Sequence, residues 1–169
     1  MTMTTDRPEQ ALSPIPEGFH TITPSLVVHD ADAAIAFYKA AFGAVELDRA
    51  SSLDGSKIMH STIQIGDSRL MVADEFPDWQ VFGPKKFGGT PLSLHLYVED
   101  ADAFYAQAVA AGATPTMPIS DVFWGDRYGR LLDPFGHDWG IASRQRIVSE
   151  EEMTAAMKAM DGCSAPPEA

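Results

Sequence analysis

The chain has 169 residues, 45% of them hydrophobic and 21% charged, which is typical of a single globular domain with a packed core. Its net charge of −12 repels phosphate backbones, so we expect no nucleic-acid partner. No apolar run reaches the roughly 18 residues that span a bilayer, so we expect no membrane contact. Residues 1–10 are polar, which predicts no secretory signal. Cys163 has no partner cysteine for an internal disulfide, and we expect a cytoplasmic protein.

An internal repeat divides the chain into two similar units. Residues 28–33, VHDADA, return as residues 98–103, VEDADA, so that the offset is 70 residues. In each copy a helical stretch follows and ends at a Gly-Ala pair. Two units that each leave a hydrophobic face uncovered are expected to pack on one another. The predicted limits are a disordered arm at 1–18, a domain at 19–145 with units at about 21–75 and 91–145, and a linker at 76–90.

The first unit has the pattern of a strand, a helix and three further strands. Residues 21–28 alternate between apolar and polar side chains, as a half-buried strand does. Asp30 or Asp32 can cap the helix that follows, and Gly43 occupies the position of its left-handed end. Three more strands are expected, at residues 45–50, 57–65 and 69–73.

The second unit repeats this order. A strand at 92–98 and a helix at about 101–111 precede three strands, expected at residues 114–119, 127–132 and 138–142. The linker is rich in Pro, Gly and aromatic residues and is expected to wrap over the domain. Ser149 to Glu152 forms a capping box, which predicts a helix over 149–160 with an apolar methionine stripe. This helix is expected to dock on its own domain or, alternatively, on a second copy, and residues 161–169 are expected to be disordered.

Two motifs carry a resemblance to a known family. Residues 34–44, AIAFYKAAFGA, resemble the first helix of the glyoxalase/bleomycin resistance/extradiol dioxygenase superfamily, also called vicinal oxygen chelate proteins. Residues 123–130, FWGDRYGR, followed by DPFGH at 133–137, are similar to its PhnB-like branch. The resemblance implies an α+β fold of two tandem βαβββ units that form facing curved mixed sheets around a cavity. It also implies a homodimer, and either a divalent metal in the cavity or metal-free binding of a drug.

The metal positions that the resemblance implies do not hold good ligands in this chain. They fall near Thr23, Met71, Ser93 and Gly140. Isolated hydroxyls, a thioether and a glycine are poor or absent ligands for such a metal. We therefore expect no cofactor, with a divalent metal as the less favoured alternative.

Strand alternation indicates which side chains line the cavity. His60 and Thr62 share one face of their strand, and His95 lies between Ser93 and Tyr97 on another, so His60 and His95 are expected to share the cavity. Either histidine is a candidate general base, or both only satisfy hydrogen bonds there. The expected ligand-binding residues are Ser25, His60, Thr62, Met71, Ser93, His95, Tyr97, Trp124 and Arg127.

Trp124 and Arg127 have two interpretations. An aromatic ring beside a guanidinium can form the wall and anchor of a binding site for a planar ligand. Alternatively, Arg127 and Asp126 hold a strand edge and Trp124 only packs. The hypothesis that follows from the sequence is a small-molecule binding protein whose ligand is cationic or planar. The alternatives are a metal-dependent lyase, isomerase or dioxygenase similar to glyoxalase I, and a metal-free enzyme with a histidine base.

Overall fold

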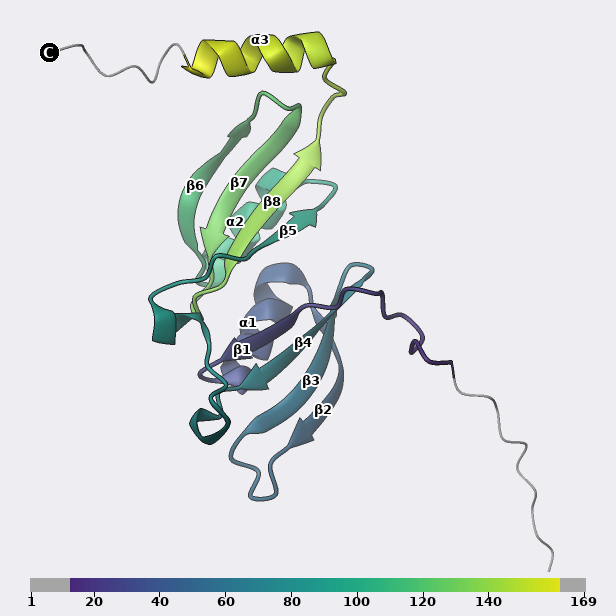
Figure 1. Ribbon diagram of the computed structural model, residues 1–169, viewed down its shortest axis with the longest axis vertical. Helices are drawn as coiled ribbons and strands as arrows, with labels where there is room; N and C mark the ends of the chain where they lie inside the picture. The colour runs from purple at the N-terminus through teal and green to yellow at the C-terminus, as the bar shows by residue number, and fades with distance from the viewer. Residues whose placement is uncertain (1–12, 162–169) are drawn as a thin grey trace, which may run out of the picture.

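The computed structural model describes residues 13–161, and both units have the predicted element order (Figure 1). The first unit consists of β1 Ser25–Val28, α1 Ala31–Phe42, β2 Val45–Ser51, β3 Ile58–Ile65 and β4 Ser68–Asp74. The second unit consists of β5 Ser93–Tyr97, α2 Ala101–Ala111, β6 Thr114–Asp121, β7 Asp126–Leu132 and β8 Asp138–Arg144. Disorder was expected for residues 1–18 and 161–169; of these, residues 1–12 and 162–169 lie outside the described residues, and Asp161 is helical.

Each unit forms one four-stranded mixed sheet. The strand orders are β1-β4-β3-β2 and β5-β8-β7-β6. In each sheet the first strand is parallel to the last, and the remaining neighbours are antiparallel. The sheets follow one another along the long axis of the molecule, with α1 and α2 behind them in the view of Figure 1. The predicted α+β fold of two βαβββ units is confirmed.

The repeated sequence marks the start of each helix. Asp30 accepts a hydrogen bond from the backbone N–H of Ala33, and Asp100 accepts the equivalent bond from Ala103, both at 3.0 Å. Such caps satisfy a donor that the first helical turn leaves without a partner. Each helix ends at a glycine with positive φ, as expected for Gly43.

An aromatic core joins the two units. The ring of Phe42 in α1 stacks on that of Phe104 in α2, with centroids 5.7 Å apart, and lies 4.6 Å from the Trp139 ring of β8. Tyr38 also contacts Trp139. Burial of each such side chain contributes about 1.5–3 kcal/mol to stability. The units are therefore held together by their helix-covered faces, which leaves the other face of each sheet open.

A buried carboxylate lies at the centre of this contact between the units. Asp133, in the turn between β7 and β8, is 4% exposed. One of its oxygens accepts hydrogen bonds from Tyr38 Oη and Trp139 Nε1, both at 2.9 Å. The other accepts from the backbone N–H groups of Phe135 and His137. Burial and the Asp133 charge raise the pKa of Tyr38 well above its usual value.

His137 makes a second polar contact between the units and predicts a pH dependence of stability. Its Nε2 lies 3.2 Å from the carbonyl oxygen of Val27, and burial lowers the pKa of His137 although Asp133 opposes this. Because the unfolded chain has the ordinary pKa of about 6.5 and binds the proton more strongly, stability should fall as pH drops through that value toward the folded pKa.

We expect the stability difference between wild type and His137→Gln to decrease from pH 7.5 to pH 5.5. Urea unfolding at several pH values measures it. A difference that stays constant over this range contradicts the assignment.

The remaining elements differ from expectation in detail. The first strand begins at Ser25, four residues after the predicted start, and the linker contains two short 3-10 helices, η1 Pro77–Trp79 and η2 Pro84–Phe87. The predicted C-terminal helix is present as α3, Glu150–Asp161, and its capping box joins Ser149 and Glu152 in both directions. The helix lies across the far end of the second sheet (Figure 1) and leaves Met157 53% exposed. No helix within residues 13–161 is long and apolar enough to cross a membrane.

Candidate functional site

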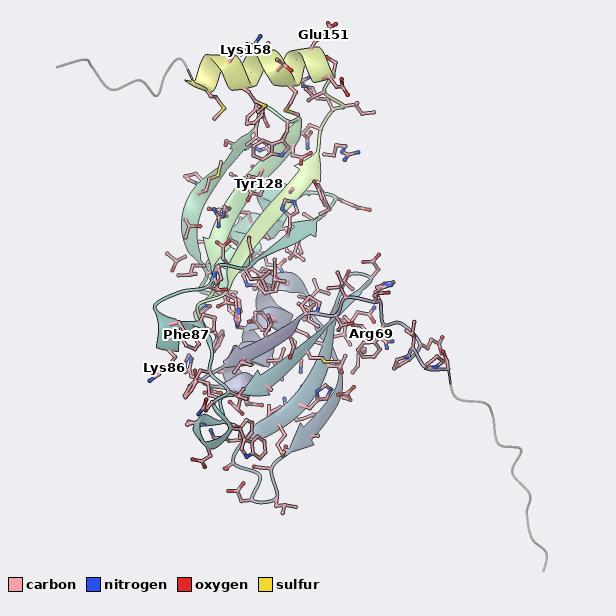
Figure 2. The ribbon with its side chains drawn as sticks, in the orientation of Figure 1. Arg69, Lys86, Phe87, Tyr128, Glu151 and Lys158 are labelled. Atoms are coloured by element: carbon pink, nitrogen blue, oxygen red, sulfur yellow. The ribbon has the colours of Figure 1, made fainter. Side chains whose placement is uncertain are left out.

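The open face of the second sheet carries an aromatic row, defined here as His95, Tyr97, Trp124 and Tyr128. The His95 and Tyr128 rings stack with centroids 5.5 Å apart and planes 9° apart. Tyr97 lies 4.7 Å from His95 on one side, and Trp124 lies 5.5 Å from Tyr128 on the other. Figure 2 shows Tyr128 over the middle of this sheet. The row therefore gathers four aromatic rings on the open face, of which only His95 and Tyr128 lie nearly parallel.

Gly140 makes the stack at the centre of the row possible. It pairs with His95 on one neighbouring strand and with Arg130 on the other. A Cβ atom at this position would lie 3.0 Å from His95 Nδ1 and 3.0 Å from Tyr128 Cε2. The two rings thus occupy the space that a side chain at residue 140 would need. The family resemblance implied only that Gly140 stands at a metal position without offering a ligand. In the structure, the absence of a side chain at Gly140 makes room for the His95 and Tyr128 rings.

Polar groups fix the orientation of the row. Asp126, only 4% exposed, accepts hydrogen bonds from Trp124 Nε1 at 3.0 Å and from Tyr97 Oη at 3.3 Å. Burial raises the pKa of Tyr128 above its ordinary value. Tyr128 was not predicted from the sequence, and Asp126 was expected only to hold a strand edge. Alternation along β7 was the available signal, because it places both residues on one face.

Arg127 lies on the opposite face of the second sheet from the aromatic row. Its Nε and Nη2 donate to both carboxylate oxygens of Asp102 in α2, at 2.9 and 2.8 Å, and Nη1 lies 3.3 Å from Asp121. This guanidinium lowers the pKa of Asp102. The structure therefore does not bring Arg127 to Trp124, and it favours the interpretation that this residue holds the strand in place.

Most of the other expected residues lie on the open face of the first sheet, but Thr62 is buried there, at 1% exposure, which contradicts its expected role in ligand binding. The register aligns Ser25 with Met71 and Met71 with Thr62, which lies two residues from His60. His60 Nε2 lies 3.3 Å from Thr62 Oγ1 and 3.6 Å from Asp48 Oδ1. Asp48 was missed from the sequence, because its position depends on an irregularity in the β2–β3 pairing just before it.

His60 and His95 lie on different sheets, β3 and β5, and not beside one another as expected. His95 borders a cavity of about 190 Å³ between the two units, called here the seam pocket. Its lining also includes His20, Thr23 and Arg69, but not His60. The structure therefore places Thr23 beside His95, and His60 in a separate polar group with Asp48.

The side chains at the implied metal positions do not make a metal site within one chain. Thr23 Oγ1 donates to the backbone oxygen of His20, and Gly140 is covered by two rings. Nowhere in residues 13–161 do three or more His, Cys, Asp or Glu side chains converge in a way that could hold a metal ion. Since three or four such ligands hold a divalent transition metal, this donor set does not fit one.

Comparison with known proteins agrees with the fold and the resemblance. Residues 18–141 match the Glyoxalase/Bleomycin resistance protein/Dioxygenase superfamily. An uncharacterized protein of Mycobacterium tuberculosis is 43% identical over 139 residues, which cover 80% of this chain and 81% of that protein.

Two solved structures illustrate the similarity in fold. TioX from Micromonospora sp. ML1 is 27% identical, with a TM-score of 0.59 over 73% of this chain and 97% of its own. A PhnB protein from Bacillus cereus shares the fold at 19% identity, with a TM-score of 0.58 over 73% of this chain and 99% of its own. Helix α3 lies beyond the residues that match the superfamily.

Proposed function

Because the chain belongs to the Glyoxalase/Bleomycin resistance protein/Dioxygenase superfamily, we propose that it binds a small planar organic molecule without using a divalent metal. The binding surface is the open face of the second sheet. The observation that carries this proposal is the aromatic row, in which His95 and Tyr128 stack over Gly140. Stacked and offset ring contacts contribute about 0.5–1.5 kcal/mol each beyond area burial, so a row of rings favours a flat ligand.

The charges around the row favour a planar cation over a planar anion. Asp126 supplies a carboxylate beneath Trp124 and Tyr97, and the chain as a whole has a net charge of −12. The nearby Arg130 guanidinium is paired with Asp138 at 2.5 Å, which neutralises it. Aromatic faces attract cations by about 0.5–2 kcal/mol, depending on how far they are desolvated.

A homodimer would complete this site. The two open faces lie side by side in one chain, so neither covers the other, and a second copy could bring its first sheet, with His60, over the aromatic row (Figure 1). Large apolar side chains are exposed beside the edge strands β1 and β5, where such a contact would form: Ile22 is 85% exposed and Leu92 is 57% exposed. Exposed apolar groups of this kind mark interaction surfaces when they cluster.

Replacing Tyr128 by Ala is expected to weaken binding of a planar cation about tenfold or more, because the ring at the centre of the row is lost. Titration calorimetry with proflavine measures this. Trp79→Leu is the matched control, since Trp79 is an exposed aromatic residue of the linker that packs on Phe76. If proflavine and other planar cations do not bind, or bind Tyr128→Ala as tightly as wild type, the proposal fails.

A second candidate function rests on the pair of His60 and Asp48. A carboxylate 3.6 Å from an imidazole can orient the ring, which suits a general base in a metal-free enzyme. In that case His60→Gln would abolish turnover. The double variant His60→Gln with Asp48→Asn would lower turnover no further than His60→Gln alone. The aromatic row would then position the substrate and not only hold a ligand.

A further inference from the structure

The seam pocket is a second candidate site, apart from the proposed planar-ligand site on the open face of the second sheet. Of the aromatic row, it includes only His95. It lies between the segment before β1 and the start of β4 in the first unit, and β5 and β8 in the second. Its volume of about 190 Å³ is below the ~300–1,000 Å³ of pockets that take drug-sized ligands. A molecule with a single ring or a short chain is therefore the size of ligand that it can take.

The walls of the seam pocket combine an apolar interior with basic groups. Leu70, Leu94, Leu96 and Trp139 supply hydrocarbon and aromatic surface. The ionisable side chains in its lining are Arg69, His20 and His95, and the lining contains no carboxylate. This is unusual in a chain with 24 acidic and 12 basic residues. Apolar walls with a few polar groups are the usual composition of a small-molecule pocket, and here those groups favour an anion.

Arg69 is the cation of this pocket, and no carboxylate among the described residues forms an ion pair with it. Of the six arginines in residues 13–161, Arg49, Arg127, Arg130 and Arg146 are each paired with an Asp or Glu, whereas Arg69 and Arg144 are not. The Arg69 guanidinium donates to the backbone oxygen of Glu17 and lies over the ring of Phe19, 4.9 Å from the centroid.

The donors of Arg69 are therefore only partly satisfied. Its Nε is buried and has no hydrogen-bond partner within the part of the chain that the structure describes. Figure 2 shows Arg69 beside the segment that leads into β1. Gly18 lies against the guanidinium, and the buried Nε does not face the pocket, so a ligand there would meet the terminal Nη groups, which a carboxylate matches best. The Asp67 carboxylate accepts from Ser68 Oγ at 3.0 Å and does not line the pocket.

We propose that the seam pocket binds a small carboxylic acid with an apolar ring or chain. The carboxylate of the ligand lies against Arg69 and one of the two lining histidines, His20 or His95. The apolar part of the ligand lies against Leu94, Leu96 and Trp139. This site is separate from the aromatic row, although His95 borders both. The two proposals can fail independently, because one requires a flat π-surface and the other requires an anion next to Arg69.

Titration calorimetry with phenylacetate, phenylacetamide and 2-phenylethylamine tests the charge preference. These three compounds share a ring and differ in the charge of their head group. We expect phenylacetate to bind at least tenfold more tightly than the other two, because charge-assisted hydrogen bonds are about twice as strong as neutral ones. Equal affinities for the three, or no binding of phenylacetate, would overturn the proposal.

Substitutions then locate the site. Arg69→Gln is expected to weaken phenylacetate binding about tenfold or more, and Arg69→Lys to retain part of it. Arg49→Gln is the matched control, since it removes a partly exposed arginine that is already paired with Asp32 and Glu46.

A second pair of variants keeps the charge unchanged. Leu96→Phe should fill the pocket and remove phenylacetate binding, whereas Trp124→Leu should weaken proflavine binding but not phenylacetate binding. Circular dichroism confirms that each variant folds. If Leu96→Phe and Arg69→Gln both fold and bind phenylacetate as wild type does, the ligand binds elsewhere and the proposal is wrong.

Discussion

Replacing Asp133 by Ala is expected to lower the free energy of unfolding by about 3–5 kcal/mol. The change leaves Tyr38 Oη, Trp139 Nε1 and two backbone N–H groups without the acceptor that they share. Each buried donor that loses its partner costs about 1–3 kcal/mol, and the structure can relax around only some of them. Because Tyr38 belongs to the first unit and Asp133 to the second, the loss should weaken the contact between the units. Urea unfolding followed by Trp fluorescence measures it.

The matched control for this prediction is Asp121→Ala. Asp121 has a side chain that is 82% exposed and lies 3.3 Å from an arginine that is also bound to Asp102. Exposed ion pairs of this kind contribute about 0–1 kcal/mol. If Asp133→Ala costs no more than this control, the carboxylate does not hold the two units together.

Replacing Gly140 by Val is expected to reduce planar-cation binding about tenfold or more while leaving the protein folded. The new side chain would meet the His95 and Tyr128 rings, which lie 3.0 Å from the position of its Cβ, and would push them out of their stack. The Asp133 hydrogen bonds and the core behind the sheet are untouched. Gly140→Ala should give an intermediate loss, because the rings must then move by only a few tenths of an ångström.

Proflavine titration compares these two variants with Ser93→Val, which adds a branched side chain to the same open face two residues before His95. Because Ser93 lies on the same binding face, Ser93→Val is expected to weaken proflavine binding, but by less than Gly140→Val does, since it leaves the stack of His95 and Tyr128 in place. Equal losses of proflavine affinity in Ser93→Val and Gly140→Val would show that any added side-chain volume on this face weakens binding. The stack over Gly140 would then have no special role.

The fold was predictable because its signals are local and occur twice. The aspartates that cap α1 and α2, and the glycines that end these helices, act through neighbours only a few residues away. A repeat of such signals fixes the order of elements in both units. The start of the first strand was predicted too early, because alternation continues through residues 21–24 although pairing with β4 begins only at Ser25.

The candidate site was predictable only where alternation within one strand decides the face. This applies to His95 and Tyr97, which share the open face of β5. Arg127 was grouped with Trp124 by sequence proximity, yet it points to the opposite face of β7 and pairs with Asp102. The contact of Asp48 with His60 depends on a pairing irregularity that sequence periodicity does not encode.

Whether His60 and His95 share a cavity could not be predicted from the sequence, for a different reason. Alternation places each histidine on an open face, but the arrangement of the two sheets decides whether those faces meet. In one chain they lie side by side, because the aromatic core packs the helix-covered faces together. No pattern within a single strand carries that information.

The central claim is that the open face of the second sheet binds a flat organic cation through its row of rings. The most direct measurement is an NMR titration of the protein with proflavine that follows the Trp124 indole N–H and the backbone amides. We predict that the largest shifts fall on residues 95–97, 124–128 and 140–142, with little change in the first sheet away from its contact with a second copy. Shifts confined to other surfaces, or no shift of the Trp124 indole at saturating proflavine, would contradict it.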